Sequence, residues 1–164
     1  MTRRGLTLME LVVTVAILSV VASMLIPLLG NDDGNRLGVA TILLRDDLEQ
    51  ARFRTVADPQ RPLAVVLDGD GLGWRVVDPA MPDVPSARDD GSPWTIRAGS
   101  GRGAGMDGVR ITLEGVSSDM LDFDESGSVR DRSATPRFRM HSGHRIQVLE
   151  VGAVTGLVRV RTER

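Results

Sequence analysis

An uninterrupted apolar run from Leu11 to Leu29 constrains the fold of this chain more than any other stretch. The run contains no charged residue, and its polar side chains are one threonine and two serines. Its nineteen residues would extend about 28 Å as a helix, which is enough to cross the hydrocarbon core of a bilayer. Arg3 and Arg4 precede the run. The positive-inside rule therefore predicts a single-pass segment with its N-terminus in the cytoplasm and everything after Leu29 translocated.

Glu10 lies at the head of this apolar run, where a carboxylate is costly. An ordinary cleaved secretory signal would explain the basic start and the apolar middle, but it gains nothing from this acid. It would also need a small-x-small cleavage site at the end of the run, where the chain reads Ile26-Pro27-Leu28-Leu29-Gly30. A natural partner for Glu10 is a cation at the same depth, such as a free α-amino group created by cleavage just before Leu6.

The stretch Gly5-Leu6-Thr7-Leu8-Met9-Glu10 and the apolar run after it resemble the class III signal of type IV pilins and type II secretion pseudopilins. The resemblance implies that a prepilin peptidase removes residues 1–5 as a leader peptide by cutting between Gly5 and Leu6. Leu6 then becomes the N-methylated first residue, although it departs from the phenylalanine that is commoner in the family.

The same resemblance implies that residues 6–29 stay in place as a transmembrane and filament-core helix. Glu10 is the fifth residue of the processed chain, as the family's acid is. Pro27 matches the helix-kinking proline of many pilins.

Composition limits what the part of the chain after this helix can be. About 130 residues remain, enough for one small domain with its own core. The chain has no cysteine, which excludes a disulfide framework and a thiolate metal site. Between Asp32 and Ser128 there are 18 acidic residues against 10 arginines, whereas residues 129–164 carry 8 arginines against 3 acids. Such a basic C-terminal quarter can attract an acidic partner, although charge of this kind is more often a solvated face.

The pattern after residue 29 predicts an α+β fold. Glycine, asparagine and aspartate over 30–35 predict a flexible break. An apolar stripe over 36–57 then predicts an amphipathic helix that stops at Asp58-Pro59 and packs on antiparallel β-sheet. We expect a loop over 81–93 and a flexible loop over 99–105. Short apolar or alternating runs predict strands at 63–68, 73–78, 94–98, 109–113, 120–123, 137–140, 146–150 and 157–160. One long helix followed by many short strands is typical of an α+β layer arrangement.

Three stretches resemble the minor pseudopilin of the type II secretion H group and the related minor pilins of type IV pili. They are the helix end Leu48-Glu49-Gln50-Ala51-Arg52, the turn Phe123-Asp124-Glu125-Ser126-Gly127, and a final hairpin from 145–148 to 155–160. The resemblance implies that residues 36–164 form a periplasmic head domain of a subunit at or near the tip of a short pseudopilus that supports protein secretion. The implied partners are the prepilin peptidase, other major and minor pseudopilins, and the inner membrane.

Patterns that could carry catalysis or ligand binding are weak. Asp122-x-Asp124-x-Ser126-Gly127 copies the opening of an EF-hand loop, but Ser133 stands where calcium needs a bidentate glutamate, so we expect a hairpin turn. The 99–105 tract lacks the Gly-Lys-Ser/Thr of a phosphate loop. His141 and His144 flank a turn with no third metal ligand nearby. We therefore predict no enzymatic activity, no metal site and no cofactor.

The predicted mechanism is structural. Glu10 would pair with the N-terminal amine of a neighbouring subunit as subunits leave the bilayer. A buried ion pair adds little net stability, but breaking it costs about 3–5 kcal/mol, so it would set the axial register of the filament.

Two alternatives stay open. A minor pilin of a type IV pilus could capture DNA through Arg159, Arg161 and neighbouring arginines, with an affinity that falls steeply with salt. No aromatic residue is interleaved there for base stacking. A plain membrane-anchored domain that never assembles would leave the bond between Gly5 and Leu6 uncut.

Overall fold

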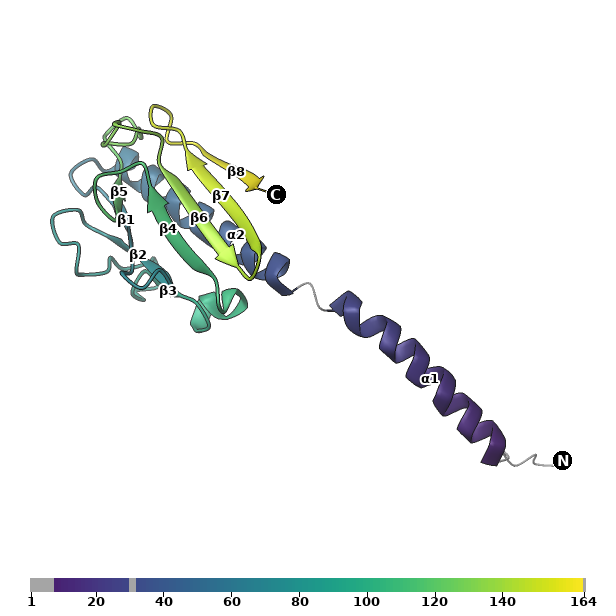
Figure 1. The fold of residues 1–164 in the computed structure, drawn as a ribbon. Coiled ribbons are helices and arrows are strands. Elements are labelled where there is room, and N and C mark those ends of the chain that lie inside the picture. The colour runs from purple at the N-terminus through teal and green to yellow at the C-terminus, as the bar shows by residue number, and fades with distance from the viewer. Residues whose placement is uncertain (1–7, 30–31, 164) are drawn as a thin grey trace. The chain divides into compact units, whose positions relative to one another are not determined.

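The computed structural model describes residues 8–29 and 32–163, with side chains for residues 8–21 and 33–161. Within these ranges the chain forms two α-helices, one 3-10 helix and eight strands (Figure 1). It divides into two compact units, residues 1–32 and residues 33–164. The elements are α1 (Leu8–Leu29), α2 (Asp32–Ala57), β1 (Ala64–Leu67), β2 (Gly73–Val77), β3 (Thr95–Arg97), η1 (Gly101–Met106), β4 (Arg110–Glu114), β5 (Met120–Asp122), β6 (Arg137–Ser142), β7 (Arg145–Val151) and β8 (Val158–Glu163). This order confirms the predicted α+β class.

α2 begins at Asp32 rather than at Arg36, so the predicted break over 30–35 is wrong for residues 32–35. Residues 30–31 lie outside the described part of the chain. The early start has a tertiary cause. The Ser142 hydroxyl donates a 2.8 Å hydrogen bond to the Asp33 carboxylate, and the Arg145 guanidinium occupies the space beside Gly34. These contacts with the turn between β6 and β7 outweigh the roughly 1 kcal/mol by which glycine disfavours a helix.

The strands form two antiparallel sheets of four strands each within the described residues. The first has the order β3-β2-β1-β5, and the second has the order β4-β6-β7-β8. In the first sheet β1 pairs with β2 through a local hairpin, and with β5 in the register Val65 to Leu121. In the second sheet β6, β7 and β8 form a meander, with β4 added beside β6. Every predicted strand is confirmed, with ends that shift by up to three residues.

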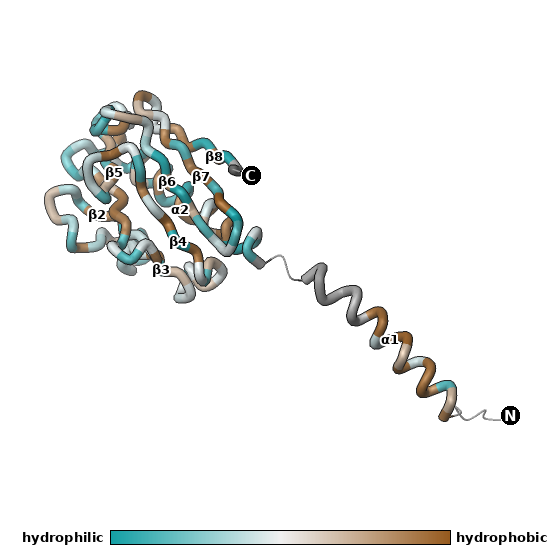
Figure 2. The backbone as a smooth tube through the Cα atoms, in the orientation of Figure 1, coloured by the Kyte–Doolittle hydropathy of each residue, from teal (hydrophilic) through white to brown (hydrophobic). Residues whose placement is uncertain are grey.

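α2 places its apolar stripe against both sheets. Its buried apolar side chains are Leu37, Ala40, Leu44, Leu48 and Ala51, as the helical period predicts. They share one core with the inward-facing residues of the strands, which include Val65, Trp74, Ile96, Ile111, Leu121, Phe138, Met140 and Leu149. Figure 2 shows brown apolar segments on the strands of the head. The helix and the two sheets therefore make one head.

The glycine tract predicted as a flexible loop is instead packed, so that prediction is wrong. Residues 101–106 form the 3-10 helix η1. Gly103 donates a 2.8 Å backbone hydrogen bond to Ser100 and lies so close to the Arg97 carbonyl that a side chain would collide with it. Met106 is fully buried in the core. Here glycine permits close packing rather than motion.

Candidate assembly surfaces

α1 presents apolar side chains on all of its described surface. All the side chains described in this helix are exposed, including Leu8 (81 %), Leu11 (57 %) and Leu18 (66 %). The described hydroxyl groups of this helix are bonded to its own backbone. The Thr14 hydroxyl donates hydrogen bonds to the carbonyls of Glu10 and Leu11, and the Ser19 hydroxyl donates one to the carbonyl of Val15. A helix that is apolar on every side is stable only when lipid or other helices surround it. This surface therefore requires a partner.

Glu10 lies in the first turn of α1 and is the helix's one charged residue by sequence. A carboxylate in the first turn of a helix is stabilised by the partial positive charge of the helix N-terminus. Gly5 and Leu6, the predicted cleavage site, lie outside the described residues. Pro27 lies within α1, which the structure continues to Leu29, and its side chain is outside the described part.

In the part of the chain that the structure describes, no helix combines the length and hydropathy that mark a membrane-spanning candidate. The predicted span of residues 6–29 extends beyond that part.

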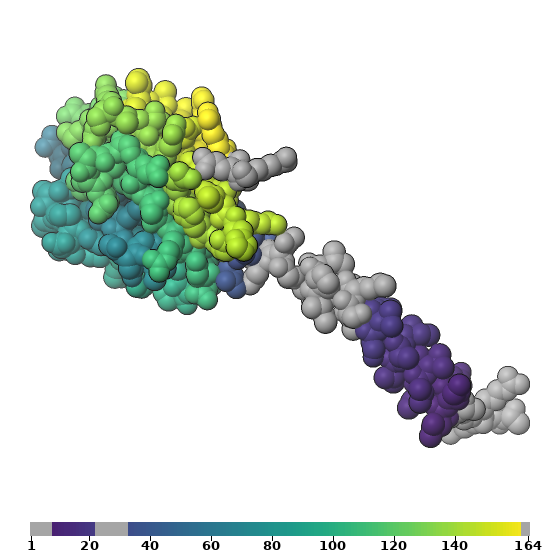
Figure 3. Space-filling view, in the orientation of Figure 1, coloured from purple at the N-terminus to yellow at the C-terminus, as the bar shows by residue number. Residues whose placement is uncertain are grey.

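Arg159 and Arg161, the residues predicted to contact DNA, lie on β8 and are both exposed. Pairing across the sheet brings two further arginines beside them. Glu150 of β7 lies between Arg137 of β6 and Arg159, and Val148 lies between Arg139 of β6 and Arg161. Paired residues of an antiparallel sheet point to the same face. The four arginines therefore share the outer face of the second sheet, which we call the arginine face. Figure 3 shows residues of β4, β6 and β7 side by side in this region, coloured green to yellow-green.

Two glutamates partly neutralise the arginine face. Glu150 accepts 3.0 Å contacts from Arg137 on one carboxylate oxygen and from Arg161 on the other. The Arg139 guanidinium lies 3.7 Å from the Glu114 carboxylate. The face keeps more arginines than glutamates, but its charges are interleaved rather than uniform.

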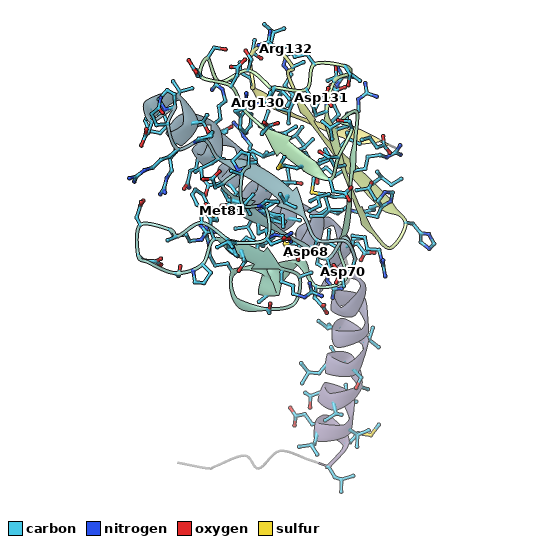
Figure 4. All side chains as sticks on the ribbon, turned by 90° about the vertical axis from the view of Figure 1, so that its left-hand side faces the viewer. Asp68, Asp70, Met81, Arg130, Asp131 and Arg132 are labelled. Atoms are coloured by element: carbon cyan, nitrogen blue, oxygen red, sulfur yellow. The ribbon has the colours of Figure 1, made fainter. Side chains whose placement is uncertain are left out.

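Other arginines of the basic C-terminal quarter serve the fold. Arg130 forms a 2.7 Å ion pair with Asp122, and Arg132 a 2.6 Å ion pair with Asp124. Figure 4 shows Arg130 and Arg132 together at one end of the head, away from Asp68 and Asp70. These arginines of the basic C-terminal quarter therefore fall into two groups, those in these ion pairs within the fold and those on the arginine face.

The EF-hand-like stretch is a hairpin turn, as predicted. Phe123 and Val129 pair across it, and the Asp124 carboxylate accepts hydrogen bonds from the Ser126 hydroxyl (2.6 Å) and the Ser128 amide (3.0 Å). The Ser126 hydroxyl, with the Ser128 amide and Arg132, lowers the pKa of Asp124 to about 2. The Ser133 hydroxyl and amide, with the amide and hydroxyl of Ser117, likewise hold the pKa of the neighbouring Asp131 well below its ordinary value. These carboxylates are occupied as acceptors within the fold.

Asp47 is a buried charge that sequence reasoning missed. Its side chain is 2 % exposed and accepts 2.8 Å hydrogen bonds from the indole nitrogens of both Trp74 and Trp94. Arg88 lies 3.4 Å from the same carboxylate, with its guanidinium 5.0 Å from the Trp94 ring centre. A signal existed in the sequence, because Asp47 lies three residues after Leu44 and so falls on the buried stripe of α2. We assign it a structural role.

The two histidines lie close to one turn of the second sheet. His141 lies near the end of β6 and His144 lies in the turn after that strand. Among the described residues, no group of three or more histidine, cysteine, aspartate or glutamate side chains is arranged to hold a metal ion.

The first 26 residues match the family model described as the prokaryotic N-terminal methylation motif. No curated protein and no solved structure gives a significant match. Proteins with this motif are anchored in the membrane by their N-terminal helix, are processed by a prepilin peptidase and assemble with other pilin-like subunits. The chain therefore carries a type IV pilin-like N-terminal methylation signal, and an α+β head follows it.

Proposed function

We propose that this chain is a minor pseudopilin of a type II secretion system, placed at or near the tip of a short periplasmic pseudopilus. The single observation that carries the proposal is the exposed apolar surface of α1 within the stretch that matches the methylation motif. The arrangement of a long helix, an amphipathic helix and antiparallel sheets is that of a pilin-like subunit. The likeness of three head stretches to the H group of minor pseudopilins, and to the related minor pilins of type IV pili, supports a minor subunit of such a filament.

In this proposal the precursor crosses the inner membrane once, with its N-terminus in the cytoplasm and its head in the periplasm. Prepilin peptidase cuts between Gly5 and Leu6, and Leu6 is methylated. The Glu10 carboxylate then pairs with the N-terminal amine of a neighbouring subunit and fixes the register between adjacent helices. Breaking such a buried pair costs about 3–5 kcal/mol, so misplaced subunits are strongly disfavoured.

The test combines mass spectrometry of the native N-terminus with an assembly assay. We expect a mature chain that begins at methylated Leu6. We also expect Glu10→Ala to stay in the membrane and to lose co-purification with the other pseudopilins. Glu125→Ala, which removes an exposed acid from a turn of the head, is the matched control and should assemble normally. An uncut chain, or full co-purification of Glu10→Ala with the other pseudopilins, would contradict the proposal.

The arginine face supports a second candidate, a minor pilin that binds DNA. It places Arg137 and Arg139 beside Arg159 and Arg161 on one surface. Phosphate contacts from such a surface would release counterions, and the affinity would therefore fall steeply with salt.

The DNA hypothesis is tested by binding of the detergent-solubilised chain to duplex DNA at several salt concentrations. Arg159→Ala combined with Arg161→Ala should weaken binding and reduce the steepness of the salt dependence by about two phosphate contacts. Arg61→Ala with Arg102→Ala removes the same charge from exposed positions outside the face and should leave binding nearly unchanged. Equal loss in both double variants would point to nonspecific attraction and contradict this candidate.

A further inference from the structure

β8 forms one edge of the second sheet and presents an open row of backbone groups there (Figure 1). The Gly152 amide donates a 2.9 Å hydrogen bond to the Leu157 carbonyl just before β8 begins, and the antiparallel pairing of β7 with β8 continues from that point. Hydrogen-bonded and non-hydrogen-bonded pairs alternate along an antiparallel ladder. The backbone N–H and C=O of Arg159 therefore face β7, whereas those of Val158 and Val160 face outward from the sheet.

The other three sheet edges of the described head are short or occupied. In β4, the Ile111 amide donates a 2.8 Å hydrogen bond to the Gly71 carbonyl of the β1–β2 turn, and in β5 the Asp122 carbonyl accepts a 3.0 Å hydrogen bond from the Arg130 amide. β3 has three residues, and its last carbonyl packs against η1. β8 has six residues, and within the part of the chain that the structure describes β7 is the one strand bonded to it. A long edge with open backbone groups is a template for pairing with another strand.

The core side of this edge is apolar and incompletely covered. Val160 lies opposite Leu149, which is fully buried, so Val160 points to the core side of the sheet. The Val160 side chain is nevertheless 41 % exposed, because β8 has a neighbouring strand on one side only. A strand added at this edge would cover it.

Arg159 places a positive charge on the opposite side of the same strand. It lies across from Glu150, but the two Glu150 oxygens contact Arg137 and Arg161 instead. Arg159 is exposed and forms no ion pair with any side chain that the structure describes. An acidic residue directly opposite Arg159 on an added strand would supply its counter-charge, and cross-strand pairs of opposite charge stabilise a sheet.

The same arginines disfavour pairing between two copies of this chain. Antiparallel pairing of two β8 strands about Val160 would place Arg159 of each copy opposite Arg161 of the other. Like charges directly opposite each other destabilise a sheet. The partner strand that fits this edge therefore belongs to a different protein and carries acids.

We propose that β8 accepts an antiparallel strand from another protein, in which apolar residues alternate with acidic residues. The apolar side chains pack beside Val158 and Val160, and the acidic side chains lie opposite Arg159 and Arg161. In this mode of recognition the main chain supplies affinity, and alternate side chains supply specificity. The contact uses the head alone, so the inference goes beyond the proposed function and applies whichever filament the chain serves.

A synthetic peptide of about eight residues, the length of an ordinary strand, is the probe, with valine and glutamate in alternation. Its binding to the detergent-solubilised full chain is followed by fluorescence anisotropy at pH 7. Methylation of the valine amide nitrogens should weaken binding by at least about ten-fold, because several backbone hydrogen bonds to β8 are lost together. Methylation of the glutamate nitrogens, which point away from β8, is the matched control and should leave binding nearly unchanged.

The peptide series also separates a strand from a merely charged ligand. Binding that does not change when the valine nitrogens are methylated would reflect attraction to the arginine face alone, as DNA binding would, and would overturn the proposal. The absence of saturable binding by the unmethylated peptide would overturn it as well.

Variants of the chain test the edge from its own side. Arg159→Glu should weaken binding of the glutamate peptide by at least about three-fold and favour a peptide with lysine in place of glutamate. Arg102→Glu, at an exposed position of η1, is the matched control. Val160→Pro removes an outward N–H, which an edge strand tolerates, and should abolish binding. All three variants are compared at equal urea midpoints, and unchanged affinities in Arg159→Glu and Val160→Pro would rule out this edge.

Amide hydrogen exchange, followed by nuclear magnetic resonance, locates the contact on the chain. In the free chain the Val158 and Val160 amides should exchange faster than the Arg159 amide, which is bonded to β7. Saturating peptide should slow exchange at Val158 and Val160 by at least about ten-fold, because their N–H groups become bonded. Protection elsewhere on the head, with no change at these two amides, would contradict the proposal.

Discussion

The Asp47 carboxylate is a charge that the fold buries and yet satisfies on both oxygens. One oxygen accepts from the Trp74 indole, and the other accepts from the Trp94 indole and lies 3.4 Å from Arg88. Both ends of the cluster are anchored in the core, because Trp74 and Trp94 are fully buried. A buried carboxylate with a full set of donors specifies how α2 lies on β2, since any shift of the helix would leave charged and polar groups unpaired.

Asp47→Asn should destabilise the head by about 2–4 kcal/mol, because the amide group turns a donor toward one indole and leaves Arg88 without its counter-charge. Urea unfolding followed by tryptophan fluorescence measures this directly, since the chain's two tryptophans both lie at the site. Asp46→Asn is the control, an exposed neighbour whose loss should stay within about 0.5 kcal/mol. Comparable losses in the two variants would contradict the assigned role of Asp47.

At the scale of elements, the pattern of apolar and polar residues predicted the helix α2 and the strands, because each of these elements forms through interactions between residues close in sequence. The amphipathic stripe of α2 and all eight strands followed from helical and alternating periods, since each element buries one face or lies between turn residues. Pairing of β5 with β1, and of β4 with β6, depends on contacts between distant segments and carries no local signal. The same limit applied to the arginine face: Arg159 and Arg161 could be singled out from the sequence, but their alignment with Arg137 and Arg139 required the register of three strands.

Substitution of two glycines would show whether packing, rather than intrinsic helix propensity, decides the stability of these elements. Gly38 lies in α2 with open space around it, so Gly38→Ala should stabilise the head by about 0.5–1 kcal/mol. Gly103 lies against the Arg97 carbonyl in η1, so Gly103→Ala should destabilise it by about 1–3 kcal/mol through overpacking. Thermal unfolding of the pair checks both signs. A stabilising Gly103→Ala would restore the view of this tract as a flexible loop.

At the scale of the whole molecule, the chain joins an apolar helix to a head with its own core. The core residues of the head lie between Leu37 and Val151, and the described side chains of α1 are exposed. The head therefore has what a small domain needs to fold, while α1 needs lipid or neighbouring helices. The two units therefore differ in how they bury apolar surface: the head buries it within its own core, and the described part of α1 leaves it exposed.

A truncated chain of residues 33–164 should consequently remain folded and soluble. We expect its urea midpoint to agree with that of the full chain in detergent, because no buried core residue is removed. Circular dichroism and gel filtration would verify the fold and the absence of aggregation. Unfolding or aggregation of the truncated chain would mean that the head depends on residues before Asp33.

The hydrogen bond that holds the first turn of α2 to the turn between β6 and β7 has a mechanical consequence. A pull on α1 travels along the chain to Asp33, which Ser142 holds by a hydrogen bond. Tension therefore enters the head at the junction of β6 and β7, where β7 pairs over six positions with each of its neighbours. The strands of the first sheet pair over only three or four positions. The apolar stripe of α2, which packs against both sheets, then shares the load with this hydrogen bond, so the head can be pulled by its helix through its whole core.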